Sequence, residues 1–238
     1  MNRLLAAYAA GATALLLAVA VFAGLRIAAR VTPAPAHRAP PTALEARAAQ
    51  IHGAVVFLGD SRVALLATSN IADRSENFGV SGQTLSGLDA ELRGVDLSGA
   101  SAIVIEAGVN DWFSSRTGFR ARYAAALAAL PLSRPVIAAA ILPVDGDEVW
   151  RVYDGDYDFR GVNAYVARWN REIESLCAAR PHCTFVPTPA ALLKGRSINS
   201  AYTLDGVHLN AAGAAIWDAA LRQALSRSGT TPRPSPST

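Results

Sequence analysis

The feature that most constrains the fold of this chain is an alternation of short apolar runs with longer alanine-rich stretches. The apolar runs are rich in valine, isoleucine and alanine and lie at residues 54–59, 102–108, 135–142 and 183–187. Continuous apolar runs of this length are typical of strands buried on both faces of a parallel sheet. A weaker strand is predicted to end near residues 77–80. The pattern predicts an α/β fold, a doubly wound parallel sheet of about five strands, with ligands at the carboxyl ends of the strands.

Three helices are predicted between and after these strands. Thr117 is expected to cap a helix that continues to residue 130, and residues 160–179 are typical of one long helix. Asn210 is expected to cap a final helix over residues 211–225, because a side-chain oxygen before the first turn can accept a free backbone N–H.

An apolar segment of about 22 residues without charge extends over residues 4–25, after a short flank at 1–3. At a rise of about 1.5 Å per residue it is long enough to cross a bilayer, which favours a transmembrane signal anchor. The alternative is a cleaved signal peptide that ends near residues 34–36. Arginines lie on both sides of the segment, so the charges do not decide its orientation.

The remainder of the chain divides into a proline-rich linker, one domain and a tail. Residues 26–42 are an extended spacer, residues 43–227 are enough for one well-buried core, and residues 228–238 resemble a disordered tail. Four arginines and no acidic residue lie within residues 1–42, so the predicted domain is nearly neutral despite the formal net charge of +3. A neutral domain has no broad basic face, and no nucleic-acid partner is expected. The oligomeric state is left open.

Two cysteines, Cys177 and Cys183, lie six residues apart. In an oxidising compartment they are close enough to form a disulfide, which would favour an exported domain. The alternative is two buried thiols that do not meet. Together with His182 they match no usual zinc pattern, so no metal is expected there.

Four polar motifs are candidates for a site: three follow predicted strands, and one lies just before the predicted final helix. Ser61, in Gly-Asp-Ser-Arg directly after the first strand, lies where a nucleophile would find free N–H groups at a helix start, although it can also be a simple helix cap. Asp205 and His208 share one loop, and the carboxylate can orient the imidazole as a general base. Asn110 follows the strand at residues 102–108 and can donate its amide to an oxyanion, and the backbone of Gly82 can approach a ligand closely.

These motifs, in this order, resemble the SGNH subgroup of GDSL esterases and lipases, through Ser61, Gly82, Asn110 and His208. The usual leucine after the serine is Arg62 here, and Gly79 competes with Gly82 for the glycine position. The resemblance implies a flavodoxin-like three-layer α/β/α sandwich and ester hydrolysis through an acyl-enzyme, with no metal and no cofactor. It also implies a catalytic triad of Ser61, Asp205 and His208, and an oxyanion hole formed by Ser61, Gly82 and Asn110.

Residues 145–159, rich in acids and aromatics, are predicted to form a loop over the carboxyl edge of the sheet. Such a loop suits a sugar ring, although its aromatics can instead simply pack the loop down. Its aspartates lack the glycine and the final glutamate of a calcium loop, so no calcium is expected.

The leading hypothesis is an extracytoplasmic, membrane-anchored serine esterase for small acyl esters, possible substrates being O-acetyl groups on envelope glycans. The alternatives are an O-acyltransferase with the same triad and a non-catalytic envelope-binding scaffold.

Overall fold

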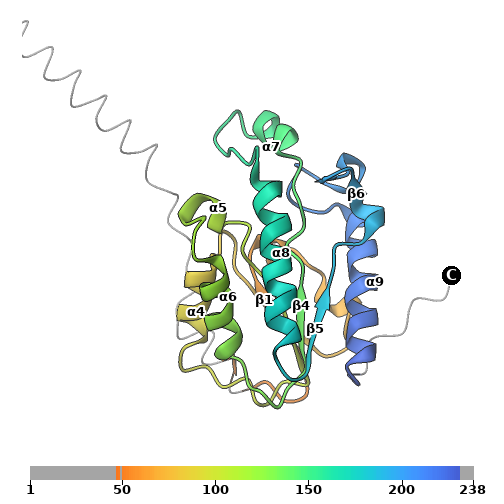
Figure 1. Ribbon diagram of the computed structural model, residues 1–238. Helices are drawn as coiled ribbons and strands as arrows, with labels where there is room; N and C mark the ends of the chain where they lie inside the picture. The colour runs from red at the N-terminus through yellow and green to blue at the C-terminus, as the bar shows by residue number, and fades with distance from the viewer. Residues whose placement is uncertain (1–46, 49, 231–238) are drawn as a thin grey trace, which may run out of the picture. The chain divides into compact units, whose positions relative to one another are not determined.

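A five-stranded parallel sheet forms the centre of the computed structural model, which describes residues 47, 48 and 50–230 (Figure 1). The strands are β1 (Val55–Gly59), β2 (Ser75–Gly79), β3 (Ala102–Glu106), β4 (Val136–Ala139) and β5 (Cys183–Val186). Their spatial order is β2-β1-β3-β4-β5, and all four neighbouring pairs are parallel. This is the flavodoxin-like order, in which ligands bind at the carboxyl ends of the strands. The predicted α/β class and the parallel sheet of five strands are confirmed.

Helices connect the strands and cover the sheet. They are α3 (Ser61–Ala64), α4 (Leu85–Leu92), α5 (Asp111–Ser114), α6 (Phe119–Ala128), α7 (Gly146–Val152), α8 (Val162–Ala178) and α9 (Ala211–Arg227). Short 3-10 turns and a small hairpin complete the described part of the chain: η1 (Thr68–Asn70), η2 (Ala190–Leu192), β6 (Leu193–Lys194), β7 (Ser197–Ile198) and η3 (Ser200–Tyr202).

The sheet has a hydrophobic core on each face, because successive side chains of a strand point to opposite sides. One core joins alternate strand residues, among them Val56, Leu58, Ile103 and Ile105, to the inner faces of α4, α6 and α8. The other joins Val55, Phe57, Val104 and Ile137 to α9. Figure 1 shows α8 crossing in front of the strands. The inner strands β1, β3 and β4 are buried on both faces, and this explains why their sequences are continuously apolar.

Of the two helix caps predicted from the sequence, the structure confirms one and contradicts the other. The Asn210 side chain accepts the Gly213 N–H at 3.0 Å, so the predicted cap of α9 is confirmed. The predicted cap at Thr117 is wrong: α6 begins at Phe119, and the residue before it is Gly118 in the left-handed conformation, with no side-chain cap. A left-handed turn favours glycine, and it brings the chain into the helix without a polar side chain.

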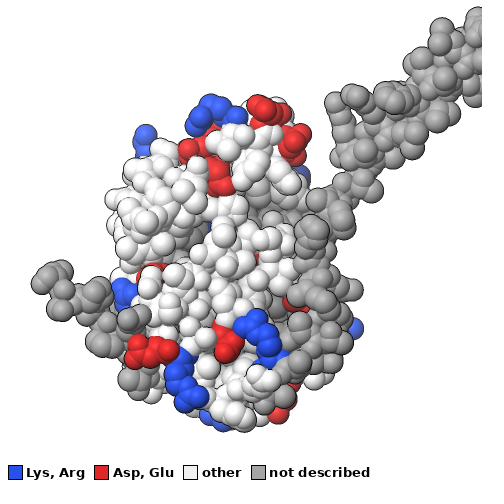
Figure 2. All heavy atoms as spheres, turned by 180° about the vertical axis from the view of Figure 1, so that it is seen from behind, with Lys and Arg blue, Asp and Glu red and all other residues white. Residues whose placement is uncertain are grey.

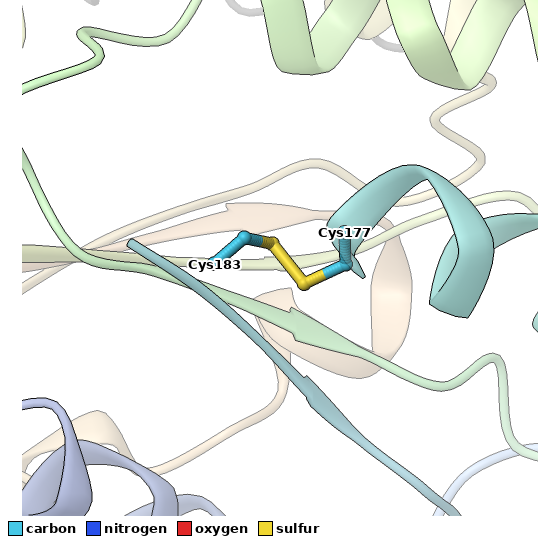
Figure 3. Close-up of a disulfide and its surroundings, with 2 residues drawn as sticks. All are labelled: Cys177 and Cys183. Atoms are coloured by element: carbon cyan, nitrogen blue, oxygen red, sulfur yellow. A yellow bond between two sulfur atoms is a disulfide. The ribbon is translucent and has the colours of Figure 1, made fainter. Parts of the chain in front are cut away.

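The two cysteines form a disulfide between the end of α8 and the start of β5 (Figure 3). The Cα atoms of Cys177 and Cys183 are 5.2 Å apart. Of the two alternatives that the sequence leaves open, the structure shows the disulfide. It lies at the amino end of β5, and thus at the edge of the sheet opposite to the carboxyl ends.

The predicted membrane segment at 4–25, the whole predicted linker at 26–42 and the last eight residues lie outside the described residues. Within the part that the structure describes, every helix is too short or too polar to span a bilayer. The face in Figure 2 carries basic and acidic side chains close together, without a continuous area of one sign. That no nucleic acid binds stays a prediction.

Candidate active site

Ser61 lies at the first position of α3, at the carboxyl end of β1, which lies between β2 and β3 in the sheet. The buried Asp60 side chain accepts the backbone N–H of Arg62 at 3.0 Å and so caps this short helix. Gly59, the last residue of β1, lies so close to β3 that an added methyl group would collide with the backbone carbonyl of Glu106. Only glycine permits this approach. The tight turn therefore projects Ser61 from the edge of the sheet.

Ser61, His208 and Asp205 form one continuous chain of hydrogen bonds. His208 Nε2 lies 2.9 Å from Ser61 Oγ, and His208 Nδ1 lies 2.7 Å from Asp205 Oδ2. The other carboxylate oxygen, Asp205 Oδ1, accepts the backbone N–H groups of Val207 at 2.9 Å and His208 at 2.8 Å. The structure thus joins Ser61 to a loop 147 positions away in the sequence.

Tyr153 makes a further contact with Asp205 that has no signal in the sequence. Its hydroxyl donates to Asp205 Oδ2 at 2.6 Å, the same oxygen that receives His208 Nδ1. Burial works against the charge of Asp205, but the hydrogen bonds from His208, Tyr153 and Val207 outweigh it and lower the pKa to about 2. The same bond, with burial, raises the pKa of Tyr153 to about 12, so its hydroxyl stays a donor. Asp205 is therefore an anion at neutral pH.

Residues 145–159 were predicted as a loop, but most of their first half forms α7. Asp145 caps this helix by accepting the N–H of Glu148 at 3.1 Å. The Asp145 N–H also donates to the carbonyl of Gly206 at 2.9 Å, and Thr203 donates its hydroxyl to Glu148 at 3.1 Å. With the Tyr153 bond, three hydrogen bonds join the α7 region to the loop that carries Asp205 and His208. The acids at the start of the segment therefore stabilise a helix as well as facing water.

Asn110 and Gly82 lie on neighbouring turns. The Asn110 amide donates to the carbonyl of Gln83, the residue after Gly82, at 3.0 Å. The next residue, Asp111, accepts the backbone N–H of Leu85 at 2.9 Å and so fixes the Asn110 turn against the start of α4. Gly82 is exposed, with φ +77°, and an added methyl group would meet no atom within 4 Å. The structure thus places Asn110 beside the turn that contains Gly82, and each of the two turns follows a strand next to β1.

A buried cluster of charged side chains, which the sequence motifs do not predict, adjoins Ser61. Asp60, Arg62 and Glu106 are each at most 6% exposed, and Trp217 donates its ring N–H to Glu106 at 3.0 Å. Burial raises the pKa of Glu106 to about 7, against the attraction of Arg62. The sequence indicates this cluster only through Glu106, an acidic residue in an otherwise apolar strand. Within residues 47, 48 and 50–230, no three potential metal ligands gather.

The fold and the site together define a flavodoxin-like α/β protein with a hydrogen-bonded Ser-His-Asp set at the carboxyl edge of its sheet. The sequence profile of the GDSL-like Lipase/Acylhydrolase family matches residues 52–216. The chain therefore belongs to this family. A search of curated proteins found no significant match.

Solved structures similar to the chain share its fold at low sequence identity. A GDSL-like lipase from Bacteroides thetaiotaomicron is 22% identical, with a TM-score of 0.59, over 79% of this chain and 98% of its own. An acetylxylan esterase from Geobacillus stearothermophilus is 19% identical, with a TM-score of 0.52, over 76% and 97%. The catalytic domain of a peptidoglycan O-acetyltransferase from Streptococcus pneumoniae is 17% identical, with a TM-score of 0.53, over 75% and 96%.

Proposed function

We propose that this protein is a serine esterase that hydrolyses small acyl esters through an acyl-enzyme on Ser61. The observation that carries the proposal is the hydrogen-bonded series from Ser61 Oγ through the His208 ring to Asp205. Such a series lets a neutral imidazole take the serine proton as the hydroxyl oxygen attacks an ester carbonyl.

Asp205 orients the imidazole and stabilises its charged form. Its pKa of about 2 keeps it ionised throughout the neutral range, so His208 Nδ1 retains a proton and Nε2 faces the serine. In the first step, the Ser61 oxygen bonds to the acyl carbon, the proton moves to His208 Nε2, and the alcohol leaves with that proton. Water, deprotonated by His208, then attacks the acyl-enzyme, and Ser61 regains its proton as the acid leaves.

The oxyanion would be stabilised by the backbone N–H groups of Ser61 and Gly82 and by the side chain of Asn110. In the described part of the chain, neither of the two backbone N–H groups has an acceptor. Asn110 uses one amide hydrogen for the carbonyl of Gln83, which leaves its second hydrogen for an oxyanion. Donors fixed before the reaction stabilise the developing charge without reorganisation.

An exposed aromatic rim favours a sugar ester, including an O-acetyl group on an envelope glycan. Phe113, on α5 directly after the Asn110 turn, is 48% exposed, and Tyr157 is 45% exposed. The two rings lie 6.2 Å apart, and Tyr157 lies 5.3 Å from the ring of Tyr153, which binds Asp205. Exposed rings that are linked through Tyr153 to Asp205 suit the apolar faces of a sugar.

The location that we propose is extracytoplasmic, with the chain anchored by residues 4–25 or secreted after their removal. The disulfide between Cys177 and Cys183 supports an oxidising compartment, because cytosolic thiols are normally kept reduced. The apolar segment supports export to a membrane or beyond it.

Hydrolysis of p-nitrophenyl esters of increasing acyl length, together with fluorophosphonate labelling, tests the proposal. Ser61→Ala is expected to abolish both activities, while Ser81→Ala, which changes an exposed serine in a neighbouring turn, leaves both intact. Asn110→Ala is expected to lower turnover by about 10²–10³. A folded wild type that neither hydrolyses nor labels would refute the esterase and favour the scaffold. Transfer of the acetyl group to a sugar in preference to water would favour the O-acyltransferase.

A further inference from the structure

Arg62, the residue after the proposed nucleophile, is unusual because its charged side chain is almost fully buried. It is 6% exposed and lies in the first turn of α3. Buried arginines are rare unless their donors are bonded and their charge is compensated. Its contacts therefore indicate why the chain has an arginine here.

The guanidinium of Arg62 binds two carbonyl groups from distant parts of the chain. Its Nε donates to the carbonyl of Val207 at 3.1 Å, and its Nη1 donates to the carbonyl of Leu142 at 2.6 Å. Val207 immediately precedes His208, and Leu142 follows β4. The planar guanidinium group thus connects the Ser61 turn with the segment after β4 and with the loop that carries His208.

Two buried carboxyl groups, those of Asp60 and Glu106, interact electrostatically with Arg62. The attraction of Arg62 opposes the rise that burial causes in the pKa of Asp60 and of Glu106. Among the described residues, Arg62 Nη2 and Glu106 Oε1 have no hydrogen-bond partner, so the attraction between these two side chains is electrostatic. A leucine at this position would offer neither the charge nor a donor to the two carbonyl groups.

We propose that Arg62 is a positioning residue that holds the His208 loop against the Ser61 turn. Ser61 and His208 are 147 positions apart, and the bond from Arg62 to Val207 is a second link between their two segments beside the Ser61–His208 contact itself. The link acts on the residue next to the proposed base, where a small movement changes the distance from Nε2 to Oγ. A misplacement of about 1 Å can cost about 10²-fold in rate.

This inference rests on the proposed serine-esterase function, and its test uses the full-length chain. Arg62→Leu is expected to lower kcat and the fluorophosphonate labelling rate by about 10²-fold with little change in KM, because Arg62 acts through His208 and not through the substrate. Arg62→Lys keeps the charge but replaces the fork by a single nitrogen, and a loss of at least about tenfold is expected.

The matched control is Arg180→Leu. Arg180 also donates to two carbonyl groups, those of Leu130 at 2.9 Å and Pro131 at 3.1 Å, but it lies in the turn between α8 and β5, at the opposite edge of the sheet. This variant is expected to lose stability and to keep kcat within about twofold of the wild type.

The outcomes separate this inference from the proposed function. If Arg62→Lys, or a folded Arg62→Leu, labels and turns over within about twofold of the wild type, the positioning role is wrong and the esterase stands. If Arg62→Leu does not fold, Arg62→Lys alone decides. If the wild type itself neither labels nor hydrolyses, the proposed function fails, and the positioning role fails with it.

Discussion

Replacing Glu106 by glutamine is expected to change how the stability of the protein depends on pH. Glu106 is 3% exposed at the end of β3, and burial raises its pKa from 4.5 to about 7. Between these two values the native protein holds a proton that the unfolded chain releases, so the free energy of unfolding falls as the pH rises through this window. Above about pH 7, Glu106 is ionised in the native protein, and the free energy of unfolding is lowered by the full cost of burying its charge.

The size of the effect follows from the two pKa values. At about 1.4 kcal/mol for each pH unit, a rise from 4.5 to about 7 corresponds to about 3 kcal/mol. Glutamine does not titrate but still offers an oxygen to the ring N–H of Trp217, which lies 3.0 Å from the Glu106 carboxylate. The stability of Glu106→Gln relative to the wild type is therefore expected to increase by about 3 kcal/mol between about pH 4 and about pH 8.

Urea unfolding followed by far-ultraviolet circular dichroism at several pH values measures this difference. Circular dichroism is preferred to fluorescence because the substitution lies beside a tryptophan. Glu174→Gln, on the exposed side of α8, is the control, and its stability relative to the wild type is expected to stay constant. A difference for Glu106→Gln that varies by less than about 0.5 kcal/mol over the same range would refute the reasoning.

Three further predictions concern other contacts of the domain. Tyr153→Phe removes one bond to the Asp205 carboxylate and is expected to cost about 1.5–3 kcal/mol at neutral pH. In urea unfolding this loss should shrink as the pH falls toward about 2, where Asp205 takes up its proton. Replacing Cys177 and Cys183 by alanine should lower the free energy of unfolding by about 2 kcal/mol without changing esterase kinetics; a loss of turnover in the folded variant would contradict this. Gly79→Ala should cost about 3 kcal/mol in thermal unfolding, because the added methyl group would collide with the α3 backbone; a variant as stable as the wild type would refute that.

Most of the sheet was predictable from the sequence because its inner strands, β1, β3 and β4, are short apolar runs with both faces buried. The runs at 54–59 and 102–108 contain β1 and β3 within three residues of their observed ends, and the weaker β2 ends where it was expected. The run at 135–142 was predicted too long: β4 ends at Ala139, although residues 140–142 are equally buried. An apolar run in a sequence indicates which residues are buried. Buried residues can continue beyond the end of a strand, as they do after β4.

The sequence predicted the residues of the hydrogen-bonded Ser-His-Asp series, but not the residues that contact and position them. Ser61, Asp205 and His208 each follow a recognisable turn, and the order of the strands brings such turns to one edge. The contacts of Tyr153 and Arg62 depend on the three-dimensional approach of segments 52 and 145 positions apart. Neither contact has a local sequence pattern, so a periodicity or a cap could not reveal it.

The attachment of α7 has a consequence for how substrates reach the serine. Three hydrogen bonds hold the α7 region to the loop that carries Asp205 and His208, and one of them ends on the Asp205 carboxylate itself. A lid that swings open at an oil surface would have to break bonds that support the proton relay. We therefore expect no interfacial activation: the rate should saturate smoothly with dissolved ester, without a jump when the substrate begins to form droplets.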